Sequence, residues 1–261
     1  MRLPFFWIDA FATRIFAGNP AGVVPLDAWL ADDLMQRIAA ENGLPETAFF
    51  VRTGPDRFHL RWFTPAREVD LCGHATVASA FVLFSELGQP GARVIFDSKS
   101  GPLPVARTPE GRLELDFPSR PVAPAPAPAD LRQGLGAEPE FVGRSRDYLC
   151  VFAREEQVRD LRPDFSALAR VPGVGVIASA PGRDCDFVSR FFAPASGIPE
   201  DPVTGSSHSA LIPYWSARLG RKRLHARQVS ARGGELFCED RAERVGIGGH
   251  AVCYLRGEIS V

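Results

Sequence analysis

Residues 73–88 read GHATVASAFVLFSELG, and residues 205–220 read GSSHSALIPYWSARLG. Each 16-residue stretch begins and ends with Gly and carries Leu immediately before its last Gly. Both stretches are mostly apolar, which predicts helices that are buried on most of their sides. They lie 132 positions apart, which indicates an internal repeat and sets the organisation of the whole chain.

Punctuating residues around the two stretches recur in the same order. Downstream, Ser98 and Gly101 match Ser230 and Gly233 at the same offset of 132. Upstream, Arg61-Trp62-Phe63-Thr64-Pro65 matches Arg190-Phe191-Phe192-Ala193-Pro194 at an offset of 129, so the second copy has a three-residue insertion before its helix. An ordered series of this kind predicts a duplication of one α+β unit.

The coarse pattern of elements is the same in both halves. An Asp27 N-cap would open a first helix that ends at Asn42-Gly43. The other predicted helices and the predicted strands follow from apolar runs and turn residues: helices at 73–87, 165–170 and 206–219, and strands at 4–11, 47–51, 57–63, 92–97, 111–117, 148–153, 174–179, 186–192 and 249–261.

These elements predict two domains of one kind. The first covers residues 1–118, a Pro/Ala-rich linker covers 119–130, and the second covers 131–248. The last strand, 249–261, is expected to return to the first domain. Two similar domains facing each other predict a cleft between them, which is the usual place for a ligand.

Composition excludes several classes of protein. The chain is 45% hydrophobic with a net charge of −1, and it has no basic stripe for nucleic acid. No apolar run approaches the roughly 20 residues of a membrane span, and the apolar stretch Phe5–Ile8 is too short for a signal peptide. We therefore expect a cytoplasmic protein with no nucleic-acid or membrane partner.

Cysteine usage predicts reduced, packed side chains. There are five, an odd number, with neither a C-x-x-C motif nor a zinc-ligand spacing: Cys72, Cys150, Cys185, Cys238 and Cys253. The sequence therefore predicts no metal site. Cys72 differs from the others because it lies inside a motif discussed below.

Glu46 is the first residue at which the two copies differ in chemistry. It follows Pro45 at the start of an apolar strand, whereas the matching stretch from Gly173 is apolar throughout. Apolar neighbours shield a carboxylate from water, which suits a general base. The alternative is a strand-end Glu that points into solvent.

The turns before the two apolar helices are the second difference. Asp70-Leu71-Cys72-Gly73-His74-Ala75-Thr76 precedes one, and Asp201-Pro202-Val203-Thr204-Gly205-Ser206-Ser207-His208 precedes the other. Gly at a helix start allows close approach of a ligand, and the free N–H groups favour an anion. The alternative is ordinary capping by Asp70, Thr204 and Ser206.

Histidine and asparagine provide further candidates. Two of the five His residues, His74 and His208, lie in these turns, and histidine titrates near neutral pH. Asn19, in the turn Gly18–Gly22, carries an amide that can donate. A structural role is the alternative for each of the three. Ser206 or Ser207 beside a histidine leaves a Ser/His hydrolase open, although no G-x-S-x-G motif supports it.

These residues together resemble one family. The matching segments, in order, are Asp9–Phe11, Gly18–Gly22, Gly43–Phe49, Asp70–Thr76 and Asp201–Ser206. They are similar to the PhzF-like family of phenazine biosynthesis, within the diaminopimelate epimerase-like fold. The resemblance implies two domains related by a pseudo-twofold axis, each a curved sheet or open barrel around a central helix. It also implies a homodimer.

The resemblance further implies an isomerase that moves a proton within a small carboxylate-bearing substrate, without metal or organic cofactor. Glu46 would be the catalytic base. His74, Asp201 and Ser206 would complete the catalytic set. The substrate carboxylate would bind at Gly73, Gly205 and Ser207, with Asn19 as a further contact.

Two other functions compete with the isomerase interpretation, and the chemistry of one related group of enzymes is disfavoured. A protein that binds a metabolite without turnover and a Ser/His hydrolase are the alternatives. Two-cysteine racemases of the same fold use a pair of thiols. Here Cys72 stands near the first thiol position but Thr204 stands near the second, which argues against that chemistry.

Overall fold

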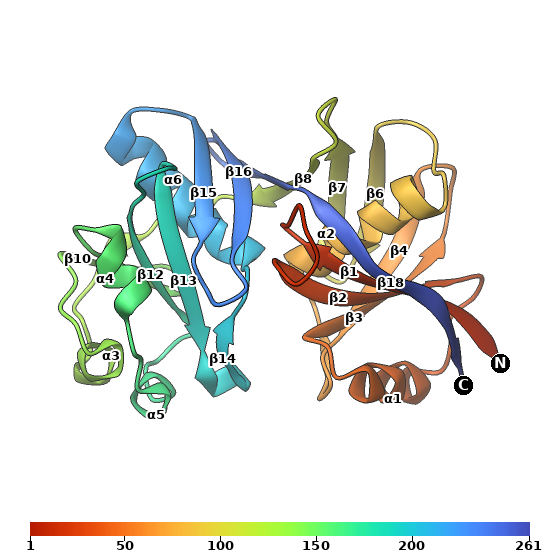
Figure 1. Ribbon diagram of the computed structural model, residues 1–261, viewed down its shortest axis with the longest axis horizontal. Helices are drawn as coiled ribbons and strands as arrows, with labels where there is room; N and C mark the ends of the chain where they lie inside the picture. The colour runs from red at the N-terminus through yellow and green to blue at the C-terminus, as the bar shows by residue number, and fades with distance from the viewer. The chain divides into compact units, whose positions relative to one another are not determined.

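The computed structural model describes all residues from 1 to 261, and the chain divides into two compact units. The first unit comprises residues 1–116 with 248–261, and the second comprises residues 117–247. Both are mixed α/β units built from twisted strands and few helices (Figure 1). No helix combines the length and the apolar character needed to cross a membrane.

The first unit contains ten strands and three helical segments. Its strands are β1 (Arg2–Ala10), β2 (Asn19–Leu26), β3 (Glu46–Arg52), β4 (Arg57–Phe63), β5 (Glu68–Val69), β6 (Arg93–Ser98), β7 (Gly101–Arg107), β8 (Leu113–Pro118), β17 (Arg244–Gly249) and β18 (Ala251–Ser260). Two of these strands cross the boundary between the units: β8 ends in the second unit, and β17 begins there. Its helical segments are α1 (Asp32–Asn42), α2 (Gly73–Phe81) and the π-helical turn η1 (Val82–Glu86).

The second unit contains eight further strands and six helical segments. Its strands are β9 (Ala123–Pro124), β10 (Phe141–Arg144), β11 (Tyr148–Val151), β12 (Val176–Pro181), β13 (Phe187–Ala193), β14 (Ile198–Asp201), β15 (Arg223–Gln228) and β16 (Gly234–Arg241). Its helical segments are α3 (Ala129–Leu135), α4 (Glu155–Asp160), α5 (Phe165–Leu168), the 3₁₀ turns η2 (Pro194–Ser196) and η3 (Gly205–Ser207), and α6 (His208–Leu219).

Strand pairing follows one order in both units. In the first unit, β1–β2 is antiparallel, β2–β3 parallel, β3–β4 antiparallel, β4–β6 parallel and β6–β7 antiparallel. In the second, β10–β11, β11–β12, β12–β13, β13–β15 and β15–β16 repeat that alternation. This agreement is what a duplicated fold requires. The last strand, β18, pairs antiparallel with β1.

Each unit encloses an apolar helix. In α2, residues 73–80 are all buried, and the helix contacts β1, β2 and β3. Its small residues, Ala75, Ala78 and Ala80, allow the strands to approach closely. In α6, the residues from His208 to Ile212 are buried, and the helix contacts β15 and β16. Helices that are apolar on all sides are stable only when strands or helices cover them.

The structure corrects several sequence-based expectations about these elements. The first helix begins at Asp32 and not after Asp27, and its acidic residues Asp32 and Asp33 interact favourably with the positive helix end. The helix predicted at 73–87 changes to a π-helical turn at Val82. Residues 18–22 were expected to form a turn, but Asn19 begins strand β2. Strand β7 was not predicted either, because Pro102 and Pro104 argue against a strand in the sequence.

Candidate active site

The start of β3 places Glu46 beside α2. Gly43 ends α1 in the left-handed conformation, at φ 61°, and the chain then turns into β3. Because β3 runs parallel to β2, with Glu46 opposite Ala21, its first side chain lies next to the helix that β2 contacts. Glu46 is 11% exposed and His74 is 7% exposed. The alternative of a solvated strand-end Glu is therefore wrong.

Glu46 and His74 form a close pair. Glu46 Oε2 lies 3.1 Å from His74 Nε2. The two atoms are within hydrogen-bonding distance, yet Oε2 is buried and has no well-aligned donor. Catalytic hydrogen bonds are often imperfect before substrate binds. The geometry suits a carboxylate that accepts a proton from elsewhere.

Asn19 and Cys72 surround the other side of the imidazole. Asn19 Nδ2 lies 3.2 Å from His74 Nδ1, and Cys72 Sγ lies 3.5 Å from the same nitrogen. Asn19 is held there by the turn at Gly18, whose φ is +67° and where a Cβ would lie 2.2 Å from the Ala10 carbonyl oxygen. Only glycine fits this turn without strain.

Burial and neighbouring charges shift the pKa values of both His74 and Cys72. Burial pushes the pKa of His74 down, but the neighbouring Cys72 and Glu46 outweigh it and raise the pKa well above the usual value. Burial, with the Glu46 charge, raises the pKa of Cys72, while the neighbouring His74 lowers it. His74 is therefore the group of this cluster whose environment most favours the protonated form at neutral pH.

In the second unit, Asp201 and Thr204 belong to one hydrogen-bonded turn. The Thr204 hydroxyl donates to Asp201 Oδ2. Gln228, on β15 and 1% exposed, accepts from the Thr204 N–H at 2.8 Å and donates to the Asp201 carbonyl at 2.7 Å. Sequence analysis missed Gln228, because 24 residues separate it from Thr204 and no motif contains it.

The two serines of this turn are both engaged, and neither has a base. Ser206 Oγ accepts from Arg146 Nη2 at 3.2 Å. Ser207 Oγ donates to the Thr204 carbonyl at 2.8 Å. Arg146 also pairs with buried Asp147 at 3.0 Å. The sequence carries no signal for Arg146, which lies 60 residues from Ser206.

His208 is a neutral structural residue. Burial lowers its pKa to about 4, so the ring is uncharged at neutral pH. Its Nδ1–H donates to the Thr204 carbonyl at 2.8 Å, which leaves Nδ1 unable to take a proton from Ser207, 3.4 Å away. A Ser207–His208 nucleophile pair is thus excluded by hydrogen bonding.

The helix starts are not capped by the side chains that the sequence suggested. Cys72 is the N-cap residue of α2, Thr204 is that of η3, and Ser207 is that of α6, and none of the three accepts a capping hydrogen bond. The capping interpretation is therefore wrong for Asp70, Thr204 and Ser206. Gly73 and Gly205 open the two helical segments and are buried.

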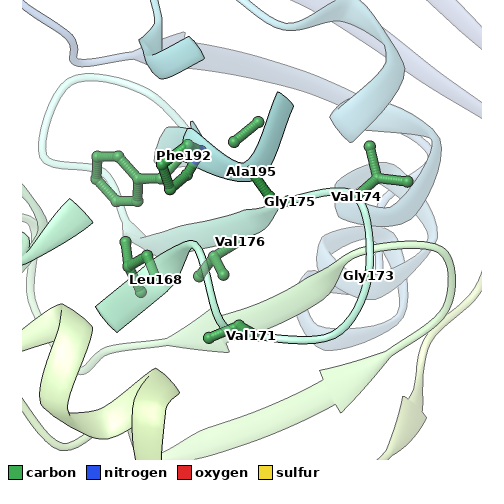
Figure 2. Close-up of a pocket in the computed structure, with 10 residues that line it drawn as sticks. Leu168, Val171, Gly173, Val174, Gly175, Val176, Phe192 and Ala195 are labelled. Atoms are coloured by element: carbon green, nitrogen blue, oxygen red, sulfur yellow. The ribbon is translucent and has the colours of Figure 1, made fainter. Parts of the chain in front are cut away.

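The predicted site residues thus form one group in each unit. Asn19, Glu46, Gly73 and His74 come together in the first unit, and Asp201, Gly205, Ser206 and Ser207 in the second. A separate pocket in the second unit contains none of them (Figure 2). It is lined by apolar side chains and glycines around α5, β12 and η2, among them Leu168, Val176 and Phe192. Because no ionisable side chain lines it, it has no group for acid–base chemistry.

Comparison with known proteins identifies the class of protein. A family model described as phenazine biosynthesis-like protein matches residues 8–257, and the chain belongs to this family. An uncharacterized isomerase of Pseudomonas aeruginosa is 55% identical over 260 residues, covering 99% of each chain. The resemblance stated from the sequence is therefore confirmed, and the chain is an isomerase of the PhzF type.

Solved structures agree with this assignment. The crystal structure of a PhzF-family phenazine biosynthesis protein from Enterococcus faecalis has a TM-score of 0.97 and 47% identity, and each chain is covered completely. A hydroxyproline epimerase from Agrobacterium vitis, 10% identical over all of this chain and 93% of its own, has a TM-score of 0.63. This distant likeness shows that the fold is shared with epimerases.

Proposed function

We propose that this isomerase transfers a proton within a small carboxylate-bearing metabolite, with Glu46 as the general acid/base and without metal or organic cofactor. The observation that carries the proposal is the buried pair of Glu46 Oε2 and His74 Nε2, 3.1 Å apart. A buried carboxylate next to an imidazole provides both a base and a second group that holds a proton. Proton transfer by a positioned side chain of this kind contributes about 10²–10⁴-fold to a rate.

The proposed step begins with the Glu46 carboxylate. It removes a proton from a substrate carbon, the electron pair of the broken C–H bond stays on the substrate, and the same carboxyl group returns a proton at another position. His74, held as a cation by its neighbours, orients Glu46 and donates to the charge that develops. The Asn19 side-chain amide lies beside His74 Nδ1, and with its oxygen turned toward the ring it accepts the Nδ1–H of this cation. The isomer forms without net gain or loss of protons.

The second unit is proposed to orient the substrate. Asp201 and Ser206 would position or polarise it, and the backbone N–H groups at Gly205 and Ser207, like those at Gly73 of the first unit, would bind its carboxylate. Support comes from the hydrogen bonds of Thr204 and Gln228, which fix the turn that carries these groups. The predicted homodimer stays a prediction, which light scattering tests.

Deuterium exchange tests the proposal directly. The protein is incubated in D₂O with a panel of small carboxylates and amino acids, and C–H exchange is followed by NMR. Glu46→Gln keeps the shape of the side chain and should slow exchange by at least about 100-fold. Glu41→Gln is the control, because Glu41 is an exposed residue of α1, and it should exchange at the wild-type rate.

The alternatives give different results. Exchange that is unchanged in Glu46→Gln would refute the role of Glu46. A compound that binds tightly and exchanges no proton would favour a binding protein. A hydrolase would lose activity in Ser206→Ala while Glu46→Gln kept most of it, and the engagement of both serines argues against that outcome.

A further inference from the structure

One buried group near Glu46 has no part in the proposed proton transfer. Cys72 is 7% exposed, and its thiol faces both nitrogens of His74, at 3.5 Å from Nδ1 and 4.0 Å from Nε2. A carboxylate oxygen of Glu46, the Cys72 sulfur and a His74 nitrogen all lie within 4.8 Å of one another. Three kinds of metal ligand therefore converge at one point, although the sequence has no metal-binding spacing.

The distances are close to those of a tetrahedral metal site. Ligands bound at roughly 2.0–2.3 Å in a tetrahedral arrangement lie about 3.3–3.6 Å apart. His74 Nε2 is 3.1 Å from Glu46 Oε2 and 4.0 Å from Cys72 Sγ. These two separations differ from the tetrahedral values by less than about 0.5 Å. The fourth position would be taken by water.

The donor set selects the metal. Thiolate, imidazole and carboxylate are the ligands of Zn²⁺, whereas Mg²⁺ and Ca²⁺ prefer oxygen ligands alone. The buried Glu46 Oε2 lies 3.1 Å from His74 Nε2, so a cation would take the place of the proton between these two atoms. A bound dication would also stabilise the thiolate form of Cys72.

Asn19 lies where a hydrogen-bond acceptor is needed for the ring nitrogen of His74 that does not bind the metal. A histidine that binds a metal through Nε2 carries its proton on Nδ1 and donates it to a nearby oxygen. The Asn19 side-chain amide lies 3.2 Å from His74 Nδ1. Rotation of the amide presents its oxygen to this proton, because the two ends of the amide have the same shape.

We propose that Glu46, Cys72 and His74 bind Zn²⁺ and that the ion switches the enzyme off. Bonds from Zn²⁺ to Oε2, Sγ and Nε2 replace three of its water ligands. The thiol proton and the imidazolium Nε2 proton pass to the buffer. Only the inhibition rests on the proposed function, since the ion occupies the carboxylate oxygen and the nitrogen that proton transfer needs. Metal binding itself does not depend on it.

Cobalt provides a spectroscopic test on the full-length protein. Co²⁺ is a coloured substitute for Zn²⁺, and a thiolate ligand gives it a charge-transfer band in the near ultraviolet. We expect one Co²⁺ per chain, a thiolate band, and loss of the band when Zn²⁺ is added, because Zn²⁺ binds more tightly. Cys72→Ser should lose the band. Cys150→Ser, which removes a buried thiol of the second unit, should keep it.

A second variant and a second readout keep the test decisive. Glu46→Gln should weaken Co²⁺ binding by about tenfold or more while keeping the thiolate band at saturation. Calorimetry in two buffers should show release of protons on Zn²⁺ binding. Absence of a thiolate band in the wild type, or an equal band in Cys72→Ser, would overturn the proposal. Zn²⁺ binding that leaves deuterium exchange unaffected would overturn the inhibition alone.

Discussion

Burial of His208 should make the stability of the second unit depend on pH in a calculable way. Its usual pKa of 6.5 falls to about 4 in the folded protein because the ring is desolvated. Each pKa unit is worth 1.36 kcal/mol. At low pH, protonation of His208 in the unfolded chain therefore lowers the free energy of unfolding by about 3 kcal/mol at most. The stability is present above pH 6.5 and is lost as the pH falls toward 4.

The perturbation that isolates this effect is His208→Asn, whose amide nitrogen takes the place of Nδ1 toward the Thr204 carbonyl. Between pH 7 and pH 5, the histidine should remove about 2 kcal/mol of unfolding free energy, because most unfolded chains are protonated at pH 5 while the folded ring is not. The variant should lack this part of the decrease, whatever constant loss the substitution causes. Other titrating groups contribute equally to both proteins.

The assay is urea unfolding at pH 7, 6 and 5, followed by circular dichroism, on the wild type and the variant. A decrease that is the same in both proteins would refute the argument. NMR of the His208 ring provides a direct check, since its carbon-bound protons should not shift between pH 8 and pH 5.5 in the folded protein.

Three further predictions follow from the same contacts. The contribution of His74 to the pH dependence of stability has the opposite sign to that of His208, because the pKa of His74 is raised in the folded protein. Its stabilisation is complete below pH 6.5 and is lost as the pH rises through the folded pKa. His74→Asn should therefore flatten the alkaline side of a profile of unfolding free energy against pH, measured by urea unfolding. Gln228→Leu leaves the Thr204 N–H and the Asp201 carbonyl without their partner and should lower the free energy of unfolding by about 2 kcal/mol in the same assay. A loss below about 0.5 kcal/mol would contradict this prediction. Gly18→Ala, at a φ of +67° and in contact with the Ala10 carbonyl, should lower unfolding free energy by more than about 1 kcal/mol, and an unchanged melting temperature would show that the turn adapts.

Local sequence patterns predicted the elements best where composition alone determines structure. Both apolar helices were found because a stretch that is apolar on all sides must be buried. Errors occurred where tertiary contacts decide. The start of α1 was placed too early, since Asp27 resembles a capping residue. Strand β7 was missed because its prolines disfavour a strand, and its pairing with β6 and β8 stabilises it nevertheless.

For the candidate site, the sequence predicted which residues matter and not what they contact. Glu46 and His74 were chosen because their motifs match the family, and their proximity is a property of the folded first unit. Ser206 and Ser207 were named as well. The hydrogen bond from Arg146 to Ser206 was not foreseeable, because 60 residues separate the two, whereas the bond from Ser207 to the Thr204 carbonyl is local and depends on the conformation of the turn.

The sequence by itself determined the duplication, the two buried helices, the family and the residue types of the site, because these depend on apolar periodicity and on motifs of neighbouring residues. Only the tertiary structure decided that β18 pairs with β1 and that Asn19, Glu46 and Cys72 surround His74. The physical reason is that parallel pairing of β2 with β3 beside α2 brings together residues from three separate segments. Contacts between side chains so distant in the chain leave no local pattern in the sequence.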